Sequence, residues 1–126
     1  MRFSKHQFER WVEDAWNSIP ESIRSKFSNL VIAVEQEPSG EQLAVAGVPP
    51  GDTLLGLYEG VPLDMRGWRY QMAMPDRITL FQGPLQRHCG DMDIRQAIYE
   101  TLWHELAHHI GMSEAEVRAA ERRKFG

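Results

Sequence analysis

The segment TLWHELAHHIGMSEAE covers residues 101–116 of the chain. It holds three of the five histidines in the chain, His104, His108 and His109. His104 and His108 are four positions apart, so on a helix both imidazoles leave the same face about one turn from each other. His109 points away from that face. The pair of His104 and His108 therefore predicts two ligands of a zinc ion.

A firm zinc site needs a third protein ligand and an open position for water. Gly111 follows His108 by three positions, where glycine can take the left-handed conformation that ends a helix. Ser113 and Glu116 have the spacing of a capping box for a final helix, which commits Glu116 to the cap. Glu114 stands at the first position of that helix and can turn toward the histidines, so it is the predicted third ligand.

Glu105 lies about 100° further round the helix than His104. From there its carboxylate reaches a water on the metal without being a ligand itself. Zinc lowers the pKa of such a water to about 7, and a neighbouring carboxylate can accept its proton during attack on a carbonyl. Glu105 is therefore the predicted general base. Tyr70, Arg69 and His88 are candidate donors to the oxyanion, although each is more simply explained as a loop or surface residue.

The elements before this motif indicate a small sheet. A first helix is predicted from Ser4, which has capping-box spacing to Gln7. Residues 91–110 are predicted to form one long helix, with Asp91 or Asp93 as its cap. Runs rich in apolar and β-branched residues predict three strands between these helices: LVIAVE within 29–37, TLLGLYEG at 53–60 and DRITLF at 76–81. This order indicates an α+β fold with its helices segregated to one side of the sheet.

Further expectations concern two connecting segments, residues 38–52 and 60–75, and the strand DRITLF. Residues 38–52 are rich in turn formers. Residues 60–75 show no clear period and carry Trp68 and Tyr70, which predicts either a mobile lid beside the metal or a surface loop with Trp68 in the core. DRITLF is the last strand before the helix that carries His104 and His108, and it is predicted at or near the sheet edge.

The composition limits the kinds of protein to which this chain can belong. The chain of 126 residues is expected to form a single domain over 1–126. Its 14 Lys and Arg stand against 18 Asp and Glu, a net charge of -4, which argues against a nucleic-acid partner. No segment has the length of a membrane span, and the N-terminus lacks the apolar core of a signal peptide. The lone Cys89 fits a reducing compartment, so a cytoplasmic location is expected; the oligomeric state stays open.

The segment HELAHHIGMSE resembles the HExxHxxGxxD/E motif of the small zincin-like metallopeptidases, minimal bacterial relatives of the metzincins. LLGLYEGVPL at 54–63 and PDRITLFQGPL at 75–85 are also similar to that family. The resemblance implies a zincin-like fold, a single zinc ion held by His104, His108 and Glu114, and hydrolysis of peptide bonds in a peptide or protein substrate. It also implies that an extended peptide would pair alongside the edge strand predicted at 76–81. The third ligand position is not histidine, as it is in larger metzincins, and only twelve residues follow it, too few for a separate Met-turn.

Two other functions remain open. A metal-binding module without turnover, such as a sensor or an interaction protein, would show the same histidines but would not need Glu105. The glutamate at that position therefore favours an enzyme. Hydrolysis of a non-peptide amide is the other possibility, because water activation is common to both reactions.

Overall fold

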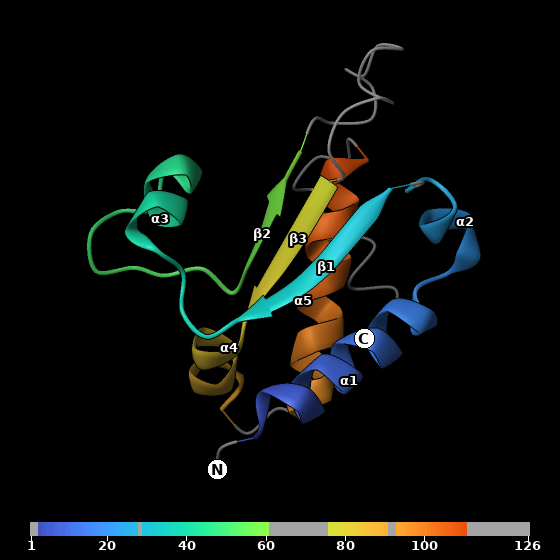
Figure 1. The fold of residues 1–126 in the computed structure, drawn as a ribbon, viewed down its shortest axis with the longest axis horizontal. Helices are drawn as coiled ribbons and strands as arrows, with labels where there is room; N and C mark the ends of the chain where they lie inside the picture. Colours follow the sequence, from blue (N-terminus) through green and yellow to red (C-terminus); the bar gives the residue numbers. More distant parts are fainter. Residues whose placement is uncertain (1–2, 28, 61–75, 91–92, 111–126) are drawn as a thin grey trace.

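The computed structural model of the protein describes residues 3–27, 29–60, 76–90 and 93–110 (Figure 1). Along these residues the elements are α1 (Lys5–Ser18), α2 (Glu21–Arg24), β1 (Leu30–Glu35), α3 (Gly40–Ala46), β2 (Gly56–Glu59), β3 (Asp76–Phe81), α4 (Gln82–Cys89) and α5 (Ile94–His109). Helices α1 and α5 pack against each other and lie on the same face of the sheet (Figure 1). The predicted α+β fold, with helices segregated on a small sheet, is confirmed.

The sheet has the order β1-β3-β2. β1 pairs with β3 in parallel, from Leu30 opposite Asp76 to Glu35 opposite Phe81, and β2 pairs with β3 antiparallel. The strand predicted at 76–81 is present with those bounds, but its predicted place at or near the edge is wrong, because it is the central strand. Five of its six residues are buried and only Arg77 is exposed, as expected for a strand with a neighbour on each side. Position along the chain does not determine position in a sheet.

The first helix forms as its sequence predicts. The Ser4 side chain accepts a hydrogen bond from the Gln7 backbone N–H at 3.1 Å, which satisfies one of the free donors at the helix start. One face of the helix then enters the core through apolar side chains at helical spacing, namely Phe8, Val12, Ala15 and, at the C-cap, Ile19.

Helices α3 and α4 are not among the predicted elements. Within the turn-rich segment 38–52, Ser39 and Gln42 form a full capping box that starts α3, and Gly47 ends this helix with φ 72°. Glycines and prolines on either side of this short helix are typical of turns, so the sequence pattern does not predict it. α4 begins directly after β3, where the Gly83 backbone N–H donates to the Gln36 carbonyl at 2.9 Å. A Cβ atom at Gly83 would lie 2.8 Å from the backbone carbonyl oxygen of Gln36, so the close approach of α4 to the end of β1 requires glycine here.

The ligand helix α5 matches its prediction closely. Its N-cap is Asp93, whose side chain accepts from the Arg95 backbone N–H at 2.8 Å. Ile98, Leu102 and Leu106 are fully buried and fix the helix against α1 and the sheet. No helix among the described residues is long and apolar enough to cross a membrane. The alternative cap Asp91 and all of the predicted lid except Gly60 lie outside the described residues.

Candidate metal and catalytic site

The last two turns of α5 bring His104 and His108 together. Their Nε2 atoms lie 3.1 Å apart, and the two rings meet edge to face with centroids 4.6 Å apart. Two nitrogens that are each about 2.0–2.1 Å from a tetrahedral zinc ion lie about 3.3 Å from each other. The spacing of the two imidazole nitrogens therefore fits a shared metal ion.

The predicted third ligand, Glu114, lies outside the described residues, as does the helix-ending Gly111. Among residues 3–27, 29–60, 76–90 and 93–110, no three His, Cys, Asp or Glu side chains form a group that could hold a metal ion. The assignment of Glu114 as a ligand therefore stays a prediction. The described residues provide two candidate ligands, His104 and His108, and a zinc site needs a third.

Glu105 is partly buried beside His104, at the end of the pocket described below. Burial raises the pKa of its carboxyl to about 6, while the charge of His104 and hydrogen bonding from the Tyr58 backbone act to lower it. A carboxyl group whose pKa lies near neutrality is suited to accept and return a proton. Glu105 therefore has both the place and the environment of a general base.

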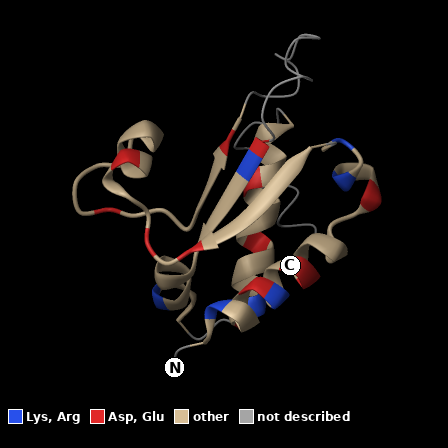
Figure 2. Cartoon of the chain, viewed as in Figure 1, with Lys and Arg blue, Asp and Glu red and all other residues tan. Residues whose placement is uncertain are grey.

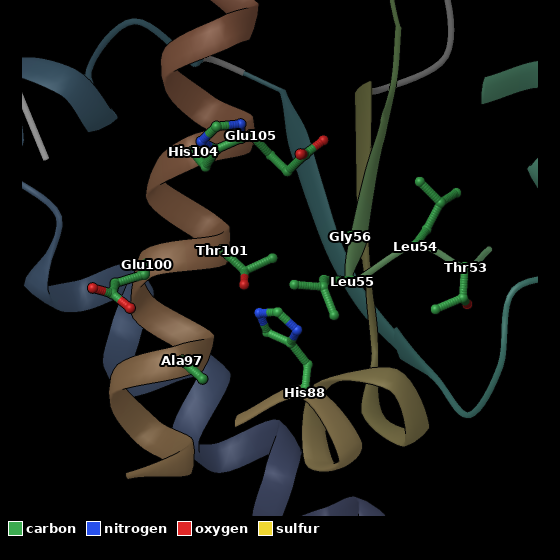
Figure 3. A pocket seen from close by; sticks show the side chains of 10 residues that line it. All are labelled: Thr53, Leu54, Leu55, Gly56, His88, Ala97, Glu100, Thr101, His104 and Glu105. Atoms are coloured by element: carbon green, nitrogen blue, oxygen red, sulfur yellow. The ribbon is translucent and has the colours of Figure 1, made fainter. Parts of the chain in front are cut away.

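A pocket of about 420 Å³ opens next to these residues. One wall is the face of α5 that carries Thr101, His104 and Glu105, and the opposite wall is the chain entering β2, with Leu55 and Gly56 (Figure 3). The His88 side chain, a candidate oxyanion donor, projects from α4 between these two walls (Figure 3). The other two candidate donors, Arg69 and Tyr70, lie outside the described residues. The pocket leads directly to Glu105, the predicted general base, and to His104, one of the predicted metal ligands.

The edge strand β2 presents part of its backbone to this site. The Leu55 carbonyl accepts from the Phe81 N–H at 3.0 Å, so by the alternation of an antiparallel ladder the backbone groups of Gly56 and Tyr58 face away from β3. A Cβ atom at Gly56 would lie 3.1 Å from both Leu80 Cδ2 and Thr101 Cγ2. Glycine therefore lets β2 approach α5 closely. A signal for this close approach is present in the sequence, because Gly56 interrupts the apolar run LLGLY and glycine inside a strand often marks a close approach.

His109 lies on a different face of α5 from the two predicted ligands, as its position in the sequence predicts. It is buried, stacks on Tyr58 and lies beside Asp76, the first residue of β3. Sequence reasoning did not find this second cluster. Asp76 and His109 are 33 positions apart, and nothing local in the sequence indicates that they meet.

Comparisons with known proteins agree with the fold and the motif. A family model described as zincin-like metallopeptidase matches residues 27–123. The protein therefore belongs to the zincin-like metallopeptidase family, as the sequence resemblance implies. A solved structure of a conserved hypothetical protein from T. thermophilus is similar, with a TM-score of 0.58 and 24% identity over 94% of this chain and 99% of that chain. This likeness concerns the fold. No protein of curated function matches the chain.

Proposed function

We propose that this protein is a zinc-dependent metallopeptidase that hydrolyses peptide bonds with a water molecule. The observation that carries the proposal is the convergence of His104 and His108, with nitrogens 3.1 Å apart, beside the raised-pKa carboxyl of Glu105 at one end of a pocket. Membership of the zincin-like metallopeptidase family supports the same class of reaction.

His104, His108 and Glu114 would hold the zinc ion, one for each chain. Bound zinc would supply a Lewis acid that lowers the pKa of water to about 7 and polarises the substrate carbonyl. Glu105 would take the proton of the attacking water and later deliver it to the leaving amine. A glutamate in this role must not be a ligand itself, which its place one position after His104 and its contact with the Tyr58 backbone both favour.

The substrate would lie as an extended segment along the side of β2 that faces away from β3, in place of the predicted pairing with β3. The Gly56 backbone faces away from β3 beside the pocket, so it can exchange main-chain hydrogen bonds with a peptide. A pocket of about 420 Å³ is large enough for one side chain of that peptide. Leu54, Leu55 and Ala97 among its lining residues would favour an apolar or aromatic side chain there.

We also propose that the protein acts in the cytoplasm, with a peptide or protein as partner and neither nucleic acid nor a membrane. Figure 2 shows Lys and Arg spread over several described elements and interspersed with Asp and Glu. With a net charge of -4, this distribution does not favour binding to a phosphate backbone. The lone cysteine is compatible with a reducing compartment.

The test is metal content together with cleavage of a peptide library, both repeated on Glu105→Gln. The amide keeps the shape of the side chain but cannot take a proton, so the variant should keep its zinc while kcat falls by about 10²–10⁴-fold. Unchanged activity in this variant would exclude Glu105 as the base. A wild-type protein that binds zinc but cleaves no peptide and no small amide would instead be the non-catalytic metal-binding module, and cleavage of small amides alone would indicate a non-peptide substrate.

A further inference from the structure

Asp76, Tyr58 and His109 form a largely buried polar cluster on a different face of α5 from His104 and His108. The Tyr58 hydroxyl donates to Asp76 Oδ2 at 2.8 Å, and His109 Nε2 lies 3.5 Å from the same oxygen. The rings of Tyr58 and His109 stack with centroids 3.8 Å apart and an interplanar angle of 16°. Asp76 is only 2% exposed and His109 only 6%, so these contacts are made almost entirely away from water.

The three residues come from the three elements that determine the shape of the site. Asp76 begins the central strand β3, Tyr58 belongs to the edge strand β2, and His109 ends the ligand helix α5. The separation between β2 and α5 is the separation between the two walls of the pocket. The cluster therefore ties both walls to the same carboxylate in the middle of the sheet.

Tyr58 connects this cluster directly to the general base. Its side chain bonds to Asp76, whereas its backbone faces away from β3 and acts on the Glu105 carboxylate as a hydrogen-bond donor. The following chain is also held close, because a side chain at Gly60 would collide with the Asp76 carboxylate. A change in the position of the Tyr58 ring is therefore passed to the backbone group that contacts Glu105.

The cost of this arrangement suggests a use beyond stability. Removing a carboxylate from water costs several kcal/mol, and apolar side chains of similar volume often give equal or greater stability. Buried polar groups are also directional, so a cluster of them defines one relative position of the elements that apolar contacts alone would leave less defined. In this protein, the cluster defines the position of Glu105 relative to β2.

We propose that Asp76, Tyr58 and His109 are positioning residues that clamp β2 to α5 and thereby orient the Glu105 carboxylate in the pocket. The catalytic consequence rests on the proposed function, whereas the clamp itself is a property of the fold. The clamp acts on the base and the pocket walls, so its loss should reduce turnover without removing the metal.

Tyr58→Phe tests the proposal with the smallest change, because it keeps the ring that stacks on His109 and removes only the hydroxyl that bonds to Asp76. On a cleaved peptide, kcat should fall about 10-fold while KM and zinc content stay close to wild type. Asp76→Asn keeps an acceptor for the Tyr58 hydroxyl and should lose less activity than Asp76→Ala. The matched control is Tyr99→Phe, whose hydroxyl meets the Ser18 carbonyl at 3.4 Å on the outer side of α5, and it should leave kcat unchanged.

Hydrogen exchange of the residue 58 amide gives a readout that needs neither zinc nor activity. In the metal-free protein, Tyr58→Phe should speed exchange of this amide about 10-fold, whereas Tyr99→Phe should not change it. If wild type cleaves no substrate, the proposed function fails and this measurement alone decides the clamp. Exchange at the wild-type rate in Tyr58→Phe would overturn the proposal, and so would a loss of kcat no larger than that of the control.

Discussion

The two faces of the last turns of α5 carry the same type of residue in contrasting surroundings. His108 is exposed, and its ring nitrogen meets that of His104 at 3.1 Å. The next residue, His109, is buried between Tyr58 and Phe27 and lies beside Asp76. A difference of one position, about 100° round the helix, separates a side chain placed to bind a metal from one placed to hold the fold together. The neighbours of a histidine, more than its place in a motif, determine what it can do.

The largest effect is expected when His108 and His109 are each replaced by alanine. His108→Ala should abolish stoichiometric zinc binding and all hydrolysis, because one histidine and one carboxylate cannot hold the ion firmly. His109→Ala should keep about one zinc for each chain, since its ring faces the sheet. Atomic absorption after dialysis measures both. Equal loss of zinc in the two variants would mean that the two faces do not differ in this way.

A matched pair of glutamates tests the ligand that should complete the exposed face. Glu114→Gln should weaken zinc affinity at least about 10-fold, because it removes the charge of the predicted third ligand. Glu116→Gln should change affinity far less, since Gln can still serve in the capping box. Competition with a fluorescent zinc chelator gives the two dissociation constants. A larger effect at Glu116 would reverse the assignment of ligand and cap.

Stability should show the opposite pattern from metal binding. In the metal-free protein, Asp76→Ala should lower the free energy of unfolding by about 3 kcal/mol, because it removes the buried carboxylate that accepts from the half-buried Tyr58 hydroxyl and lies beside His109. His108→Ala changes an exposed side chain and should stay within about 0.5 kcal/mol of wild type. Urea unfolding followed by tryptophan fluorescence measures both. Similar losses in the two variants would show that burial does not separate the two faces.

Loss of the exposed ion pair between Glu37 and Arg87 should give the smallest effect on stability, in contrast to loss of the buried Asp76 carboxylate. Arg87 donates two hydrogen bonds to the Glu37 carboxylate, at 2.8 and 2.9 Å. Hydrogen bonding from Arg87 lowers the pKa of Glu37, so the pair stabilises the fold above the ordinary glutamate pKa and loses this contribution as pH falls through the lowered value. Arg87→Gln should therefore give the smallest change in melting temperature at pH 7, and a smaller one still in acid. A change that grows in acid would contradict this sign.

The sequence predicts the parts of this molecule that depend on local spacing. The positions of His104 and His108 on one helical face and the strand at 76–81 follow from the periods of helix and strand, and Asp93 is one of the two caps that the sequence offered. The order of the strands does not follow, because it depends on contacts between segments far apart in the chain. For the same reason Asp76 could be assigned to a strand from sequence, but its meeting with His109 could not.

The central place of β3 has a consequence for how the chain folds during synthesis. β1 and β2 are each paired with β3 in the described sheet, and β3 is the last of these three strands to be translated. At a translation rate of about 5–20 residues per second, the interval between the end of β1 at residue 35 and the end of β3 at residue 81 lasts roughly 2–9 s. During that time the apolar run LVIAVE of β1 has no strand of its own chain to pair with in the native register. We expect this nascent segment to be the part of the protein most exposed to chaperones and to self-association.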